Sequence, residues 1–129
     1  MKGIDDLKDG LCYNDIKNKY SWLLSADIDE AVIGERNNSL MWYNGRWNGG
    51  TWKSGIWRSG VWEDGIWDNG LWMFGLWQNG IWNDGFWSNG YWRGGEWRNG
   101  YWMLGEWEEG IWNGGKVHNG EYFEHLSER

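Results

Sequence analysis

The feature that most constrains this chain is a five-residue repeat, Gly-x-Trp-x-x, which fills its central and C-terminal parts. Tryptophan stands at every fifth position from Trp42 to Trp112, and Val117 and Tyr122 hold the next two such positions. Glycine precedes the tryptophans by two residues from Gly45 onward. An α-helix would scatter this period around its axis, and the glycines would destabilise it by roughly 1 kcal/mol per repeat. The array is therefore predicted to be β structure.

Two β arrangements suit a short repeat of this kind. Asn-Gly pairs such as Asn69-Gly70 and Asn79-Gly80 favour tight hairpins and hence an antiparallel meander. Such turns would leave an odd number of strand residues, so the meander would need a bulge at every second turn. In a solenoid, each pentapeptide forms one side of a coil, and the coils stack in parallel about 4.8 Å apart. We therefore expect a mainly β solenoid, with the bulged meander as the alternative.

The pattern resembles the pentapeptide-repeat family, in which a small residue, a polar residue and Leu or Phe precede two variable residues. That resemblance implies a right-handed β-helix with four sides per coil, in which glycine and tryptophan take the inward positions. This chain departs from the family in having Trp for Leu, and often Ile, Val, Leu or Tyr where the family has Asp or Asn. It also resembles Trp-rich Gly-x-Trp repeat proteins of bacteriophage genomes. Four sides per coil would give a rod of about four coils and about 20 Å.

The predicted core consists of the repeated indoles, because aromatic side chains bury a large area and β neighbours point to opposite faces. This core ladder comprises Trp47, Trp52, Trp57, Trp62, Trp67, Trp72, Trp77, Trp82, Trp87, Trp92, Trp97, Trp102, Trp107 and Trp112. Glycine beside each ring is expected where the backbone bends or packs closely.

A ten-residue alternation runs inside the five-residue repeat. One set of residues before tryptophan is uniformly apolar, whereas the alternate set becomes charged at Glu96 and Glu106. With tryptophan inside, an apolar strip would face outward and serve as a protein interface. The candidate interface residues are Leu71, Phe74, Ile81, Tyr91, Tyr101, Leu104 and Ile111. The alternative interpretation is that both faces are buried within one chain.

Residues 1–39 lack the repeat and are predicted to form a helical cap or docking segment before the array of residues 40–122. Asn14 or Asp15 can begin a helix, and Ser25 can begin a second one that ends at Gly34. The expected inward residues are Ile16, Tyr20, Leu23 and Leu24 in the first helix, and Ile28, Ala31 and Val32 in the second. Residues 123–129 are expected to form a short polar C-terminal cap.

The composition argues against several classes of function. A net charge of −7 without a long basic patch does not suit a nucleic-acid ligand. The single cysteine, Cys12, excludes an internal disulfide framework, and the N-terminus lacks the apolar run of a signal peptide. His118 and His125 are interpreted as surface residues, and the cluster Glu106, Glu108 and Glu109 as a solvated face. We therefore expect no catalytic site, no metal, no cofactor and no membrane span.

Three functions remain as hypotheses. The first is a structural protein of a phage virion or other assembly, in the virion or cytoplasm, bound to protein subunits or to further copies of itself. The second is an adhesin-like rod that binds glycans through exposed aromatic rings. The third, implied by acidic members of the pentapeptide-repeat family, is a DNA mimic that inhibits gyrase. Basic residues such as Arg93 and Arg98 interrupt the acidic ones and weaken this third hypothesis.

Overall fold

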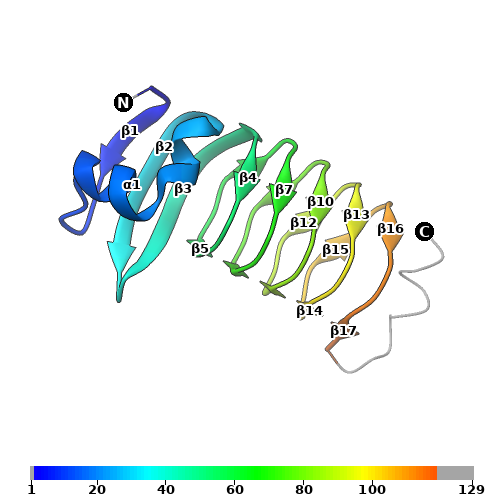
Figure 1. The fold of residues 1–129 in the computed structure, drawn as a ribbon. Coiled ribbons are helices and arrows are strands. Elements are labelled where there is room, and N and C mark those ends of the chain that lie inside the picture. Colours follow the sequence, from blue (N-terminus) through cyan, green and yellow to red (C-terminus); the bar gives the residue numbers. More distant parts are fainter. Residues whose placement is uncertain (1, 119–129) are drawn as a thin grey trace.

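The computed structural model describes residues 2–118, which form a β-solenoid rod closed at one end by an N-terminal cap (Figure 1). The C-terminal cap expected at residues 123–129, with His125, lies outside the described residues, as does Tyr122. The N-terminal cap contains β1 (Ile4–Leu7), α1 (Tyr13–Lys19), the 3-10 helix η1 (Ser21–Ser25) and β2 (Asp27–Arg36). The rod begins with β3 (Ser39–Gly49) and continues with two-residue strands. These are β4 (Thr51–Trp52), β5 (Ile56–Trp57), β6 (Val61–Trp62), β7 (Ile66–Trp67), β8 (Leu71–Trp72), β9 (Leu76–Trp77), β10 (Ile81–Trp82), β11 (Phe86–Trp87), β12 (Tyr91–Trp92), β13 (Glu96–Trp97), β14 (Tyr101–Trp102), β15 (Glu106–Trp107), β16 (Ile111–Trp112) and β17 (Lys116–Val117).

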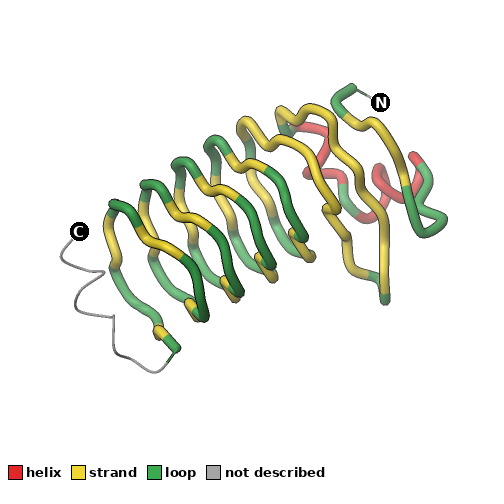
Figure 2. The backbone as a smooth tube through the Cα atoms, turned by 180° about the vertical axis from the view of Figure 1, so that it is seen from behind, coloured by secondary structure: helices red, strands yellow, loops and turns green. Residues whose placement is uncertain are grey.

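The coil has three sides, not the four that the family resemblance implied. Trp42 pairs with Trp57 and Trp57 with Trp72, so parallel partners are three pentapeptides apart. The parallel pairing also rules out the antiparallel meander. Figure 2 shows the coils following one another along the rod. Five steps of about 4.8 Å lead from Trp42 to Val117, which makes the rod about 24 Å long.

Each side is a ladder of short strands. The first side contains the start of β3 followed by β5, β8, β11, β14 and β17. The second side contains the end of β3 followed by β6, β9, β12 and β15. The third side contains β4, β7, β10, β13 and β16. Because β3 belongs to both the first and second sides, those two sides form one sheet and the third forms its own.

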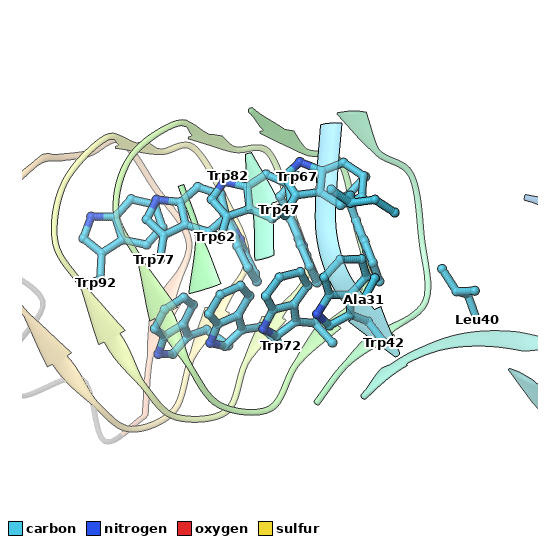
Figure 3. Packing of buried hydrophobic residues seen from close by; sticks show 14 of the residues in the cluster. Ala31, Leu40, Trp42, Trp47, Trp62, Trp67, Trp72, Trp77, Trp82 and Trp92 are labelled. Atoms are coloured by element: carbon cyan, nitrogen blue, oxygen red, sulfur yellow. The ribbon is translucent and has the colours of Figure 1, made fainter. Parts of the chain in front are cut away.

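Indole packing explains why three sides close the coil. Successive tryptophans meet edge to face, with ring centroids 5.7–5.9 Å apart, so three rings fill the triangular cross-section. Rings in neighbouring coils stack face to face at 4.7–5.1 Å with interplanar angles of 3–7°. Trp77 and Trp92, labelled in Figure 3, lie in one such row. The centroid distances are close to the strand spacing of about 4.8 Å, so each coil lies almost directly over the one before.

Glycine allows the sharp corners that a triangle needs. At Gly85 the backbone φ is +127°, in the region where an L side chain is strained. A Cβ there would lie 2.5 Å from the Gly70 carbonyl oxygen one coil earlier and 3.2 Å from Nε1 of Trp67. The glycine thus serves the turn, the coil spacing and the indole together.

The N-terminal cap covers the first layer of indoles, but it differs from the expected helical hairpin. The segment predicted as a second helix is β2, which pairs antiparallel with β3 and places Ile33 beside Trp42 and Ile28 beside Trp47. Pairing with the open edge of the solenoid overrides the helical pattern there, with a register shift around Glu30, whose φ is +54°. Trp22 in η1 covers the third side, with its ring centroid 5.2 Å from that of Trp52.

The first helix exists, but it begins earlier than predicted. Its N-cap is Cys12, and the Asp15 carboxylate accepts a hydrogen bond of 3.0 Å from the Cys12 backbone N–H. Asp15 therefore acts from inside the first turn and not as the N-cap. Ile16, Tyr20 and Leu23 are buried as expected. Leu24 is 43% exposed, because the chain leaves the α-helix for η1 before this residue.

Candidate interaction surface

The predicted core ladder lies inside the rod. Trp42 through Trp97 are 0% exposed, and the last three tryptophans are at most 7% exposed. The indole nitrogens point toward the corners, where Trp72, Trp77, Trp87 and Trp97 each donate to a backbone carbonyl seventeen residues later at 2.9–3.1 Å. The rings are therefore unavailable as platforms for a ligand, and any interaction must use the outward positions.

The candidate interface residues predicted from the ten-residue alternation do not form one strip. Leu71 and Tyr101 lie on the first side, and Phe86 stands between them. Tyr91 lies on the second side, whereas Ile81 and Ile111 lie on the third. Since a coil has an odd number of sides, every step of two pentapeptides lands on a different side. The expectation of a single strip was wrong, because it assumed an even number of sides.

Two of the three corners are polar and bonded from coil to coil. At the corner between the second and third sides, the Arg93 guanidinium lies 3.3 Å from the Glu108 carboxylate. At the corner between the third and first sides, Lys53 Nζ lies 3.5 Å from Asp68, and the Asn83 amide donates to Asp68 at 2.9 Å. Partners one coil apart thus pair much of the charge at these corners.

The corner between the first and second sides has a different composition. We call it the apolar corner, and it comprises the successive pairs Arg58-Ser59, Met73-Phe74, Ser88-Asn89 and Met103-Leu104. Phe74 is 55% exposed and Leu104 is 54% exposed, and both methionines are exposed as well. The outward residues of the adjoining first side are also apolar or aromatic from Ile56 to Tyr101, whereas Met41 in the same column is buried. Phe74 and Leu104 of the apolar corner, and Leu71 and Tyr101 of the first side, were among the predicted interface residues.

Large and small residues alternate along the apolar corner. Two shallow grooves meet at Phe74, which lines both of them together with Asn89. The groove nearer the cap is also lined by Lys8, Tyr43 and Arg58. The other reaches the second side, where it is lined by Tyr91 and Glu106 over a glycine backbone. The corner is thus a row of apolar projections with hollows at its small polar residues.

The charge near this surface is sparse. Arg58 is the single charged residue of the apolar corner, and its guanidinium lies 5.8 Å from the centre of the Tyr43 ring. The Tyr43 hydroxyl donates a 2.6 Å hydrogen bond to Asp9, and this bond raises the pKa of Tyr43. Burial, followed by the nearby Glu108 carboxylate, raises the pKa of Tyr91. Both phenols therefore stay neutral in ordinary buffers.

The other residues singled out in the sequence are spread over the rod surface. His118 is exposed, with Nδ1 2.8 Å from the Tyr101 hydroxyl. Glu106, Glu108 and Glu109 are exposed near the last coil. Across residues 2–118, no three His, Cys, Asp or Glu side chains are grouped so that they could hold a metal ion. No helix in the same range has the length and apolar character to span a bilayer.

Comparison with known proteins gave no match to a family model, to a curated protein or to a solved structure. The rod is a β-solenoid of five-residue repeats, consistent with a pentapeptide-repeat-like fold.

Proposed function

We propose that the chain is a non-enzymatic structural repeat protein, a component of a phage virion or other assembly, which binds protein subunits through its first side and apolar corner. It would occupy the virion or the cytoplasm in which the assembly forms. The observation that carries this proposal is the asymmetry of the rod surface. Two corners pair much of their charge between coils, whereas the third exposes Phe74 and Leu104 over more than half of their surface.

This asymmetry supports docking for a physical reason. Exposed apolar side chains that lie together, with paired charges beside them, are typical of protein interfaces. The rod is also well suited to rigid docking, because its coils are held by stacked rings and by backbone hydrogen bonds such as Phe86 N–H to Gly70 O at 2.9 Å. A rigid surface loses little conformational entropy when a partner binds.

The two alternative functions have less support. A glycan-binding rod of the kind hypothesised would present its tryptophans to solvent, but those of the array are 0–7% exposed. A DNA mimic would present rows of unpaired acidic groups. In this rod Asp68 lies beside Lys53, and Glu108 lies beside Arg93.

The proposal is tested by isolating intact particles or assemblies from the source and identifying their proteins by mass spectrometry. We expect this chain among them, with cross-links to its neighbours concentrated around the first side and apolar corner. The double variant Phe74→Asp/Leu104→Asp should lose incorporation. Ile111→Asp on the third side, where Ile111 is 60% exposed, is the control and should be retained. Absence of the chain from every particle would overturn the proposal.

A further inference from the structure

We propose that the first side and apolar corner bind a second copy of this chain, in an antiparallel two-fold dimer centred on the rod. The inference rests on the proposed function, since it names the partner of the same surface. Three features support it, namely the charge of the chain, the order of large and small residues along the corner, and the area available.

Charge restricts where two copies can meet. Each copy carries a net charge of −7, so surfaces that bring carboxylates together would repel. From residue 41 to residue 104, the first side and apolar corner contain one charged outward residue, Arg58. This is the surface on which two acidic copies can approach with the least repulsion.

The order of residues along the corner selects the antiparallel arrangement. In a parallel pair, equivalent positions would coincide, so Phe74 would face Phe74 of the second copy and Arg58 would face Arg58. In an antiparallel pair with its axis midway between Met73 and Ser88, each large residue instead faces a smaller or different one. Phe74 then lies opposite Asn89 of the second copy, Met73 opposite Ser88, Leu104 opposite Ser59, and Met103 opposite Arg58.

The same axis suits the rest of the surface. On the first side it places Leu71 opposite Phe86 of the second copy, and Ile56 opposite Tyr101. The two Arg58 guanidiniums lie about three coils apart, or about 14 Å along the rod, which exceeds the screening length at physiological salt. The rods overlap along their full length, because the axis falls in the middle of the six-member column from Tyr43 to His118. Rings in neighbouring coils stay stacked at 4.7–5.1 Å along the array, so the columns stay nearly straight over this length.

The area is sufficient for a modest dimer. A side about 24 Å long and about 16 Å wide, with the projecting corner at its edge, offers roughly 500 Å² per copy. The total of about 1,000 Å² is at the lower limit of specific interfaces. We therefore expect a dissociation constant in the micromolar range and not an obligate dimer.

The experiment is analytical ultracentrifugation of the full chain over a range of about 1–200 µM, which brackets a micromolar constant. We expect a monomer–dimer equilibrium. Phe74→Asp/Leu104→Asp should raise the dissociation constant at least about a hundredfold, since each substitution affects both halves of the interface. Ile111→Asp adds the same kind of charge on the third side and should change the dissociation constant less than about threefold.

A second pair of variants tests the hollows without adding charge. Ser88→Trp fills the hollow opposite Met73 and should abolish the dimer. Gln78→Trp, at the corresponding position of the corner between the second and third sides, should leave it intact. Thermal unfolding followed by circular dichroism checks that each variant is folded, so that loss of the dimer is not mistaken for loss of the rod.

Spin labels determine the orientation. In a Cys12→Ser background, labels at Asn79→Cys lie near the axis, whereas labels at Glu109→Cys lie near one end of the rod. The antiparallel dimer predicts offsets along the rod of about 1 Å and about 18 Å, respectively, so the second distance should be clearly longer. Equal distances would overturn the antiparallel arrangement. A monomer at every concentration would overturn self-association but leave the proposed function standing if Phe74→Asp/Leu104→Asp still loses incorporation into particles.

Discussion

Replacing Gly85 by alanine should destabilise the rod far more than the same replacement at Gly94. At Gly85 the φ of +127° is strained for alanine, which costs about 1–3 kcal/mol. The new Cβ would lie 2.5 Å from the Gly70 carbonyl oxygen, so the two coils must separate locally. That separation weakens the 2.9 Å hydrogen bond from Phe86 N–H to Gly70 O, at a further cost of about 1–2 kcal/mol. The free energy of unfolding should therefore fall by about 2–5 kcal/mol.

Gly94 supplies the matched control within the same array. Its φ is not in the positive region, and an added Cβ would meet only the Gln78 carbonyl oxygen, at an ordinary contact distance of 3.5 Å. Gly94→Ala should be neutral or stabilise the rod by about 0.4–1 kcal/mol, because it restricts the unfolded chain. Urea unfolding followed by tryptophan fluorescence measures both variants. A Gly85→Ala variant that stays within about 0.5 kcal/mol of the parent protein would refute the steric role of glycine at the corners.

Three further predictions concern the core and the cap. Trp82→Ala removes a fully buried ring stacked at 4.8 Å on Trp67 and 4.7 Å on Trp97, so urea unfolding should show a loss of about 3–5 kcal/mol. The native protein should fluoresce at the blue end of the tryptophan range and shift to red on unfolding, and a native maximum typical of exposed indoles would contradict the buried core. The hydrogen bond from the Tyr20 hydroxyl, followed by that from Lys19, lowers the pKa of Glu35 from its ordinary value of 4.5. The Glu35 carboxylate therefore contributes its full stabilisation above pH 4.5, and this is lost as the pH falls through the lower pKa of the folded state. Thermal unfolding should then be less sensitive to acid in Glu35→Gln than in the parent protein, and equal sensitivity would argue against this role.

The repeat predicts the class of fold because its local requirements are strong. A glycine beside a ring every five residues excludes a helix and favours parallel stacking, and the structure is a β-solenoid of this kind. The number of sides depends on non-local packing, which local propensity does not encode. Three indoles close a cross-section at edge-to-face centroid distances of 5.7–5.9 Å, and glycines such as Gly85 permit the sharper corner. The analogy with leucine-based repeats therefore predicts one side too many.

The cap shows a different limit of sequence reasoning. The residues at Ile28, Ala31 and Val32 fit a helical pattern, yet the segment is a strand because the first coil offers it an unpaired edge along β3. Trp22 stands outside the continuous array, so the repeat does not identify it as part of the indole core that it covers at Trp52. Both errors arise where a segment's partner is distant in sequence and its own pattern is short.

The three-sided coil also determines which positions of the sequence can together form one continuous surface. Tryptophan and glycine supply the core and the corners, so three positions in each pentapeptide remain free to vary. Positions fifteen residues apart share a column, whereas positions ten apart wind around the rod. A contiguous surface must therefore repeat with the coil, as the run Ile56, Leu71, Phe86 and Tyr101 does. Phe74 and Leu104 lie two coils apart in one column, with the smaller Asn89 between them. This alternation fits the surface to an inverted copy of itself, whereas a uniformly apolar column would not select one orientation.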